Sequence, residues 1–472
     1  GTVKKPESPR NPGMFDEKTY YEGKGCAFYM ISEREEVVDV GRWNLGEALR
    51  LERERCCAVL KEMMPEEEAG VLSAMLLGER SELTEETYLA YQQSGLLHLI
   101  SVSGMHLMLL GMALRRLLMA LHLPKTPASL AAAAGMVLYG MFTGSGTATV
   151  RAVVMFAVRM GAVAVGRTYD SLSALSLAAI LMLAENPSYL EQSGFWLSFG
   201  AVTAISGVYP VLAGEKAERK RRGEKTGLEK LAAKGKEAAM VYLSLQLVMI
   251  PLQAWYFYEI PVYAVFVNLL MLPMMGVLLG FGAAGGMVGL LSLPLAKGML
   301  FPCRILLFMG KHICALAGML PGAMWIVGRP QCWQIAVYYA FLGAGTCLVH
   351  RQREQREREK EHGRRAEQKS GGHPGVFLAA LLLLAVLGVP RSGEAELDML
   401  DVGQGDGCYL QTKEGYHLFV DGGSSNVGKV GTYRILPFLK YKGVKKIDCW
   451  VVSHTDEDHI SGLREILSSG YP

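Results

Sequence analysis

The sequence predicts a polytopic α-helical membrane protein whose membrane region lies between two water-exposed parts. Half of the 472 residues are hydrophobic. Residues 96–349 consist mostly of long apolar blocks with few charges, which is the pattern of successive membrane helices. Residues 1–95 and 391–472 have instead the mixed composition of soluble protein. This contrast along the chain indicates the fold class.

The apolar part divides into about 10–11 segments. They run at roughly 96–114, 127–143, 147–165, 171–184, 193–212, 239–257, 261–281, 283–301, 303–320, 332–349 and 375–390. Several are shorter than the ~20 residues that cross a bilayer upright. Some contain helix-weakening residues, such as Pro251, Pro273 and the pair Gly285-Gly286. We therefore expect some of these helices to be broken or re-entrant, which is tolerated where backbone faces protein or a water-filled cavity.

The segment before the membrane region has two parts. Residues 1–40 contain turn chemistry and a few β-prone residues, which indicates the end of a small β domain whose beginning is missing. Residues 41–95 read as charged, amphipathic helices, and we expect them at the membrane interface. The chain starts at Gly1 and stops at Pro472, shortly after a motif that opens a metal site, so we expect a piece of a longer protein.

Two basic runs set the expected orientation. Nine Lys or Arg lie between Lys216 and Lys236, and eight lie between Arg351 and Lys369. Both runs also contain Glu, and the net charge is only +3, so we favour solvated cytoplasmic loops over nucleic-acid-binding arms. The second run falls in an expected cytoplasmic loop at 350–374.

This orientation places the N-terminal part outside, because five crossings precede the first basic run. A membrane helix at 375–390 would return the chain, so that residues 391–472 also lie outside. Five apolar segments separate the two basic runs, although an even number is needed to return to the same side. We therefore expect one of them, 283–301 or 303–320, to be interfacial or re-entrant.

After Pro390 the pattern changes to short strands separated by turn residues. The strands are expected at Leu397–Val402, Cys408–Thr412, His417–Val420 and Asp448–Ser453. Strands followed by a loop that carries acids and histidines are typical of a layered α/β hydrolase domain.

That loop carries the clearest chemical signal in the chain. His454, Asp456, Asp458 and His459 supply two imidazoles and two carboxylates within six residues, directly after an apolar strand. These donors suit Zn²⁺ or Mn²⁺. A loop at a strand end can direct alternate side chains toward two metal ions, the arrangement used in phosphoester hydrolysis. The alternative is a solvated polar loop, and the spacing after a strand favours the metal site.

Two glycine-rich pieces upstream fit the same domain. Leu400–Asp406 is a strand that enters a glycine turn, and Phe419–Gly423 is a strand that ends in an acid and two glycines. Asp406 and Asp421 are therefore candidates for groups that brace the metal loop by hydrogen bonding. The alternative for each piece is ordinary hairpin turn chemistry.

The first membrane segment carries an unusual set of polar residues, His98, Ser101, Ser103 and His106. Polar groups are costly in hydrocarbon, so we expect them to face the bundle interior or a cavity. The alternative is helix packing through small residues, with histidines bonded across helices. Arg151, a lone cation inside an apolar segment, has three open roles: it neutralises a phosphate, pairs with Glu185, or caps a neighbouring helix.

Several motifs in order resemble the ComEC family of bacterial DNA-uptake channels. In the membrane region they are Leu77-Gly78-Glu79-Arg80, Gly95 to His106, Thr149-Val150-Arg151-Ala152, Asn186-Pro187, Gly194 to Phe199, Pro251-Leu252-Gln253 and Asn268 to Pro273. The pieces DVGQGD and SHTDEDH resemble the family's C-terminal domain. The resemblance implies a multi-pass channel in the bacterial cytoplasmic membrane that takes up single-stranded DNA. It also implies partners: a DNA receptor and cytoplasmic DNA-translocating proteins, besides DNA and lipid.

The resemblance extends to the terminal domains. The N-terminal part would be the end of an OB-fold domain, and residues 391–472 the start of a metallo-β-lactamase-like domain that degrades the strand not imported. The signature of that domain is His-x-His-x-Asp-His, and Asp456 stands where its second His is common. By resemblance His454 and Asp456 hold one divalent ion, Asp458 and His459 hold the second, and Asp456, Asp458 and His459 act in catalysis. Further ligands would come from later in a longer chain.

Two other functions stay open on the sequence. One is a metal-dependent membrane hydrolase that acts on another phosphoester or a lipid-linked substrate without transport. The other is a transporter whose outer domain is not catalytic.

Overall fold

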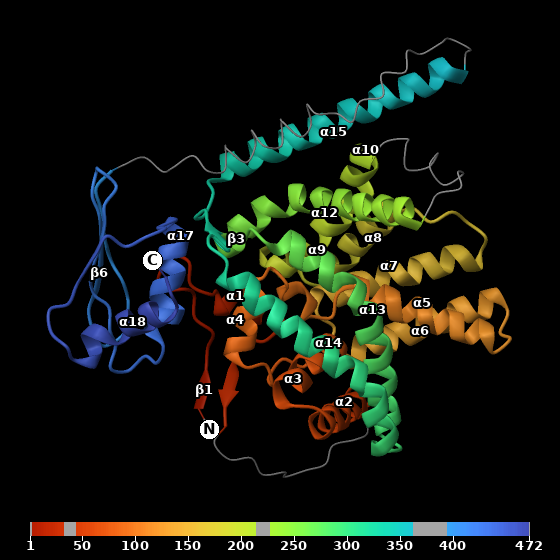
Figure 1. Ribbon diagram of the computed structural model, residues 1–472, viewed down its shortest axis with the longest axis horizontal. Coiled ribbons are helices and arrows are strands. Elements are labelled where there is room, and N and C mark those ends of the chain that lie inside the picture. Colours follow the sequence, from red (N-terminus) through yellow and green to blue (C-terminus); the bar gives the residue numbers. More distant parts are fainter. Residues whose placement is uncertain (1, 33–43, 214–226, 362–393, 472) are drawn as a thin grey trace.

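The computed structural model describes residues 2–32, 44–213, 227–361 and 394–471. A helical bundle makes up most of the molecule, and a smaller domain built on a sheet lies at one end of it (Figure 1). The N-terminal segment lies between these two parts.

The N-terminal segment contains a two-stranded antiparallel sheet. β1 (Thr2–Lys4) pairs with β2 (Tyr29–Ile31), and α1 (Glu17–Glu22) lies between them in the chain. Arg10 and Asn11 attach this segment to the C-terminal domain: the Arg10 guanidinium lies 3.0 Å from the Asp401 carboxylate, and the Asn11 amide donates to the Asp401 carbonyl at 2.8 Å. The assignment to an OB fold stays a prediction, and residues 33–40 lie outside the described part.

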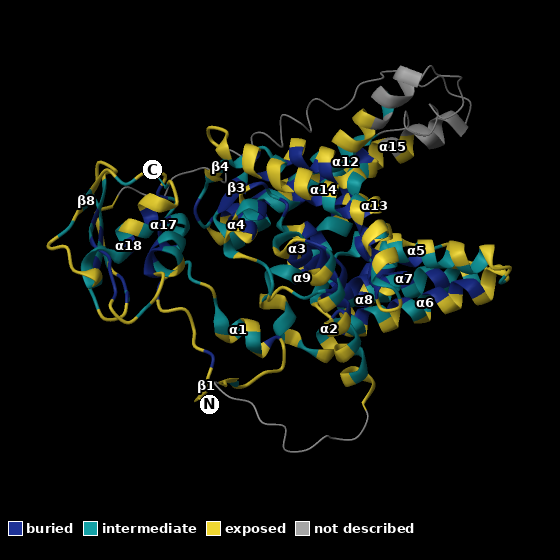
Figure 2. Ribbon diagram, turned by 60° about the horizontal axis from the view of Figure 1, so that its bottom comes forward, coloured by how far each residue is buried: buried dark blue, intermediate teal, exposed yellow. Residues whose placement is uncertain are grey.

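Three helices precede the membrane spans: α2 (Leu45–Met63), α3 (Glu66–Leu77) and α4 (Glu85–Gln93). α3 is buried continuously from Ala69 to Leu77 (Figure 2). It belongs to an apolar cluster that includes side chains of α13 and α14. It is therefore a core helix, whereas we expected an amphipathic interfacial one. The reason is that its charges, Glu66 to Glu68, are confined to its first turn, so no polar face extends along the helix.

Seven helices of the described part are long and apolar enough to cross a membrane. These candidate spans are Leu97–Ala120, Thr147–Ala164, Ser193–Ala213, Gly235–Phe257, Ala264–Gly289, Leu293–Met319 and Cys332–Gln352. At most 39% of the most apolar 18-residue stretch of any span is buried inside the protein, and large apolar side chains such as Phe266 and Phe301 are exposed. Apolar surface of this extent is stable in lipid rather than in water. The chain is a multi-pass membrane protein.

The bundle helices follow one another through short connections. They are η1 (Leu97–Leu99), α5 (Gly104–Ala120), α6 (Lys125–Phe142), α7 (Thr147–Ala164), α8 (Ser171–Glu185), η2 (Pro187–Glu191), α9 (Ser193–Thr203), the π-helical η3 (Ala204–Val208), α10 (Tyr209–Ala213), α12 (Gly227–Phe257), α13 (Ala264–Gly289), α14 (Leu293–Met319) and α15 (Cys332–Glu361). α6 and the shorter α8 complete the bundle beside the seven candidate spans.

Our expectation for the middle of the bundle is wrong. The three segments expected between 261 and 320 form only two helices, α13 and α14, and neither 283–301 nor 303–320 is a separate re-entrant piece. Pro251 and Pro273 lie inside continuous helices. A proline removes only one helical hydrogen bond, and packed neighbours can satisfy the freed carbonyl. Four candidate spans therefore separate the two basic runs, an even number, so no interfacial helix is needed there.

The second basic run also differs from the expected loop at 350–374. α15 continues without interruption from the apolar part through Arg351 to Glu361. The remainder of that expected loop and the helix expected at 375–390 lie outside the described residues.

The C-terminal domain is built on a four-stranded sheet in the order β5-β6-β7-β8. The strands are β5 (Glu396–Met399), β6 (Gly407–Gln411), β7 (His417–Asp421) and β8 (Cys449–Val451). β5-β6 and β6-β7 pair antiparallel, and β7-β8 pair parallel. η5 (Gly431–Ile435) and α17 (Leu436–Lys442) form the crossover between the parallel strands, and α18 (Glu457–Ser468) follows β8. The expected strands are confirmed to within a few residues, while the metallo-β-lactamase assignment stays a prediction.

An ion pair ties this domain to one end of the helical bundle. β3 (Glu259–Pro261), after α12, pairs antiparallel with β4 (Met324–Ile326), after α14. The Glu259 side chain is only 4% exposed, and its carboxylate lies 2.6 Å from the Lys440 ammonium on α17.

Backbone contacts reinforce that ion pair. The Arg329 N–H donates to the Tyr441 carbonyl at 3.0 Å. Gly328 and Gly443, at φ +77° and φ +76°, pack against each other, and a Cβ on Gly328 would lie 2.9 Å from the Gly443 Cα. Glycine permits both the left-handed backbone and this close approach. The C-terminal domain therefore contacts the loops at 258–263 and 320–331 directly.

Candidate functional site

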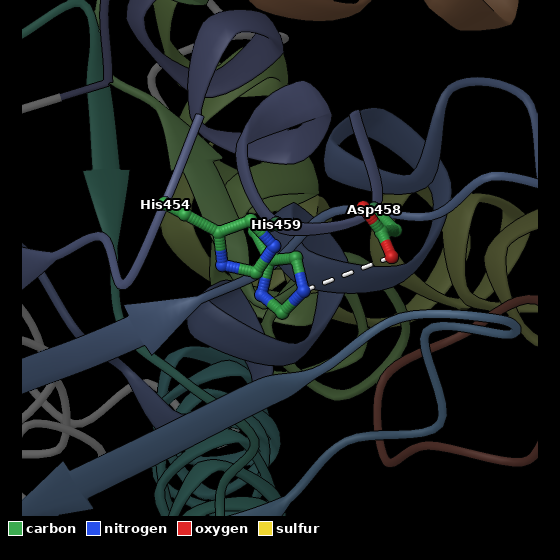
Figure 3. A group of neighbouring side chains, drawn as sticks. All are labelled: His454, Asp458 and His459. Atoms are coloured by element: carbon green, nitrogen blue, oxygen red, sulfur yellow. Dashed lines mark ion pairs between the residues drawn. The ribbon is translucent and has the colours of Figure 1, made fainter. Parts of the chain in front are cut away.

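The acid and histidine run forms a cluster at the end of β8. The loop after β8 and the first turn of α18 bring one ligand atom each of His454, Asp458 and His459 to within 4.8 Å of one another (Figure 3). The two imidazole centroids lie 3.8 Å apart, and the His459 Nε2 is 3.7 Å from the Asp458 carboxylate. Two imidazoles and a carboxylate at this loop-to-helix junction are a suitable donor set for a divalent metal ion.

Asp421 supports this cluster from the neighbouring strand. It is buried and ends β7 with a positive φ, an uncommon backbone conformation for a residue with a side chain. Its carboxylate accepts from the Ser453 N–H at 2.7 Å and lies 3.1 Å from the His459 Nδ1. The parallel β7-β8 pairing brings these groups together, since Asp421 is the last residue of β7 and Ser453 comes two residues after the end of β8.

The electrostatics of the pair follow from these contacts. Burial by itself raises the pKa of Asp421, but the hydrogen bonds from Ser453 and His459 outweigh it and hold the pKa below its usual range. The hydrogen bond to Asp421 raises the pKa of His459. The Ser453 hydroxyl also lies 3.0 Å from the His454 Nδ1, so it connects Asp421 to both imidazoles. The arrangement fixes the orientation of His459 as groups around a metal ligand do.

Two other predicted residues stand apart from this cluster. Asp456 is the N-cap residue of α18, and its side chain is 75% exposed, with one carboxylate oxygen 3.5 Å from the His454 Nε2. Asp406 is exposed, and its backbone carbonyl accepts from the Gly422 N–H at 2.7 Å. Of the four predicted ligands, three therefore gather closely and Asp456 lies beside His454.

The polar stretch of the first membrane segment forms a helix start, not the middle of a helix. Ser103 is the N-cap of α5 and makes a capping box with His106. In this box the Ser103 N–H donates to the His106 Nδ1 at 3.3 Å. His98 is exposed in η1, and its carbonyl accepts from the Ser101 hydroxyl at 3.1 Å. His106 is fully buried, and its Nε2 has no hydrogen-bond partner among the described residues.

Arg151 lies where three of the quoted motifs meet. It is only 6% exposed, and its Nε donates to the Ser198 hydroxyl at 2.6 Å. A Cβ on Gly104 would lie 2.7 Å from the Arg151 Nη2, so the glycine at the start of α5 makes room for the guanidinium. Arg151 therefore bonds to Ser198. It does not pair with Glu185, which was one of the three roles that the sequence left open. A cation with neutral partners inside a membrane bundle is a candidate anion contact.

A cavity of about 2490 Å³ opens beside these residues. It is lined by the N-terminal segment, the α6-α7 and α8-α9 connections, the C-terminal end of α12, Arg329 and Tyr441. Sequence reasoning did not find this cavity, because its walls come from segments that lie far apart in the chain, from Pro9 to Tyr441. Ser101 is the only residue of the predicted polar set that lines it.

Comparison with known proteins identifies the family. The family model described as "Competence protein" matches residues 75–352. ComE operon protein 3 of Bacillus subtilis is 25% identical over 99% of this chain and 58% of its own length. Competence protein ComA of Neisseria gonorrhoeae is 28% identical over 84% of this chain and 52% of its own length. Recombination protein 2 of Haemophilus influenzae is 24% identical over 98% of this chain and 59% of its own length.

The chain spans just over half the length of these curated relatives. No solved structure gives a significant match. The family match covers most of the helical bundle, including His98, His106 and Arg151, and ends within α15, so it does not include the C-terminal domain. The chain belongs to the competence protein family, in agreement with its resemblance to ComEC.

Proposed function

We propose that this protein is a channel that moves single-stranded DNA across the bacterial cytoplasmic membrane during natural transformation. The observation that carries the proposal is the buried Arg151 within the matched family region. Its hydrogen bonds go to the neutral Ser198 and Met155, so the guanidinium keeps a charge that a passing phosphate can neutralise. A DNA receptor and cytoplasmic translocating proteins would act with it.

The proposed orientation places the cavity and both terminal parts outside. Five helices, α5 to α9 with its continuation, precede the first basic run, and four candidate spans separate the two runs. The connections at 143–146, 186–192, 258–263 and 320–331 then share one side, and both basic runs share the other. The positive-inside rule assigns the basic side to the cytoplasm.

The contact between Lys440 and Glu259 supports a C-terminal domain on the side of the bundle opposite the basic runs. Glu259 follows α12 on the side opposite the basic runs, whereas α15 carries the chain to the basic side. A C-terminal domain in contact with Glu259 therefore requires a further crossing after α15. The apolar segment 375–390 is shorter than the ~20 residues of an upright span, so this crossing would need a locally thinned bilayer.

Replacement of Arg151 tests the channel. We expect Arg151→Gln in the full-length protein to lower uptake of labelled DNA at least tenfold in a transformable strain that lacks its own channel, while Arg151→Lys retains more uptake. The matched control is Arg159→Gln, which removes a second arginine from the same helix and should preserve uptake. Normal import by Arg151→Gln, at a normal amount of protein in the membrane, would contradict the proposed role.

We also propose that the C-terminal domain hydrolyses phosphodiester bonds of the strand that is not imported, with divalent ions such as Zn²⁺ or Mn²⁺. His454, Asp458 and His459 fit one ion by donor type and spacing. Asp456, together with donors from a longer chain, would serve a second ion. A bound ion would supply Lewis acidity and lower the pKa of a water ligand. Asp421 and Ser453 would orient His459 and His454.

Asp458→Ala tests this second proposal in the purified full-length protein. We expect bound metal and DNA hydrolysis to fall together. The control is Glu457→Ala, whose carboxylate is exposed and pairs with Arg464 instead. If DNA hydrolysis needs no metal, or if Asp458→Ala changes neither bound metal nor hydrolysis, the protein would be a channel with an inert outer domain. Hydrolysis with no effect of the protein on DNA uptake would favour a membrane hydrolase without transport.

A further inference from the structure

The large cavity is rich in aromatic residues. Twelve of its 54 lining residues are Phe, Trp or Tyr, more than twice the 9% found in the whole chain. Its volume of about 2490 Å³ exceeds the roughly 300–1,000 Å³ of small-molecule pockets, so its size suits a segment of a polymer. Aromatic rings that line an open path are the usual platforms for unpaired nucleobases.

The charges of the lining point to bases rather than phosphates as the main contact. Four basic side chains and four acidic ones of the described residues line the cavity, so this part of the lining carries no formal net charge at pH 7. Binding driven by phosphate neutralisation needs an excess of Lys and Arg. Stacking does not need that excess, because every base has a π face.

Three residues form a stack where the two domains meet. The Arg329 guanidinium lies 4.0 Å from the centroid of the Trp255 ring and 5.7 Å from that of the Tyr441 ring. Tyr441 also meets Tyr258 edge to face, with centroids 5.3 Å apart. Trp255 lies near the end of α12, Arg329 follows β4, and Tyr441 belongs to α17, so the stack spans both domains.

The stack is held in place and remains accessible. The hydrogen bond from the Arg329 N–H to the Tyr441 carbonyl fixes the spacing of these two residues. Trp255, Arg329 and Tyr441 are each half-buried and each line the cavity. Their planar groups are therefore ordered before a ligand arrives, which reduces the entropy lost on binding.

We propose that Trp255, Arg329 and Tyr441 form a stacking site for unpaired bases of a single-stranded nucleic acid. The inference rests on the proposed channel function and adds the point at which a strand is held between the outer domain and the membrane spans. A duplex has its bases already stacked on one another, so the site selects single strands. The ring faces of Trp255 and Tyr441 that Arg329 does not cover serve as the platforms.

Binding by the purified full-length protein in nanodiscs tests the site. The probes are fluorescent oligothymidylate of about 20 nucleotides, which is longer than a typical single-strand site, an abasic deoxyribose-phosphate strand of equal length, and a duplex. The wild type should bind oligothymidylate at least tenfold more tightly than either of the other two. Trp255→Ala and Tyr441→Ala should each weaken oligothymidylate binding roughly tenfold and leave abasic binding unchanged.

Matched variants separate stacking from a folding defect. Trp255→Phe and Tyr441→Phe keep a ring and should retain most of the affinity. Trp333→Ala removes an exposed tryptophan of α15 that does not line the cavity, and it should bind as the wild type does. Loss of binding in Trp255→Phe equal to that in Trp255→Ala would overturn the stacking role.

Two further results would overturn the site. One is equal binding of the abasic and base-containing strands, and the other is stronger competition by an unfolded peptide than by oligothymidylate.

DNA uptake measured in parallel separates this inference from the channel proposal. If Trp255→Ala and Tyr441→Ala bind as the wild type does while uptake still depends on Arg151, the stacking site is wrong and the channel proposal holds. If DNA uptake does not depend on the protein, both the stacking site and the channel proposal are wrong.

Discussion

Lys440→Met is expected to loosen the C-terminal domain from the helical bundle. The Lys440 ammonium lies 2.6 Å from the Glu259 carboxylate, whose side chain is 4% exposed, while that of Lys440 is 21% exposed. The other Glu259 oxygen accepts from the Gln92 amide at 2.9 Å. Removal of the ammonium therefore leaves a buried carboxylate with one neutral hydrogen bond.

The magnitude follows from this geometry. Removing one partner of a buried ion pair costs about 3–5 kcal/mol. The bond retained from Gln92 and the partial exposure of Lys440 place the free-energy cost at the lower end, about 3 kcal/mol. This value corresponds to roughly a 150-fold shift in the docking equilibrium. Replacing both partners, as in Glu259→Gln with Lys440→Met, should recover most of the loss because no buried charge remains.

Hydrogen–deuterium exchange of the purified protein measures this effect. Peptides that cover β3 and α17 should exchange faster in Lys440→Met and regain protection in the double variant. The control is Lys446→Met, whose side chain is 70% exposed and whose ammonium lies 3.4 Å from the Asp448 carboxylate. Such a surface pair is worth under about 1 kcal/mol. The prediction is contradicted if peptides of β3 and α17 exchange no faster in Lys440→Met than in Lys446→Met. It is also contradicted if Glu259→Gln, added to Lys440→Met, restores no protection.

Two further predictions concern Gly104 and Asp401. The Cβ of Gly104→Ala would meet the Arg151 guanidinium at 2.7 Å. This overpacking should destabilise the bundle by about 1–3 kcal/mol; unchanged thermal unfolding in detergent would contradict this. Burial raises the pKa of Asp401, but Arg10 and Arg434 outweigh it and lower that pKa. The attachment of the N-terminal segment should therefore hold above the ordinary pKa of about 3.9 and weaken as pH falls through the lowered value. Protection of that segment, as the exchange rate relative to the intrinsic amide rate at each pH, measures it between pH 6 and pH 3, and Asp401→Asn should remove the loss of protection at low pH.

The sequence by itself determined the features that depend on local pattern. Apolar runs of membrane length indicated a multi-pass protein, because such surface is stable only in lipid. Alternating residues and glycine turns located the four C-terminal strands. The donors His454, Asp458 and His459 lie within six residues, so one short segment is enough to gather them, and their proximity could be expected without the fold.

The number of spans was less predictable, although it also depends on local sequence. A hydropathy profile dips at Pro and Gly, and we expected breaks at Pro273 and Gly285. The helix α13 continues through both, because backbone hydrogen bonds and packing against α14 decide continuity.

Only the tertiary structure decided which distant residues meet. Asp421 reaches His459 through the parallel pairing of β7 and β8. Arg151 meets Ser198, 47 residues away, through packed helices. The stack of Trp255, Arg329 and Tyr441 requires two domains to dock. No local periodicity encodes such contacts, because the partner of each side chain is selected by the packing of whole elements against one another.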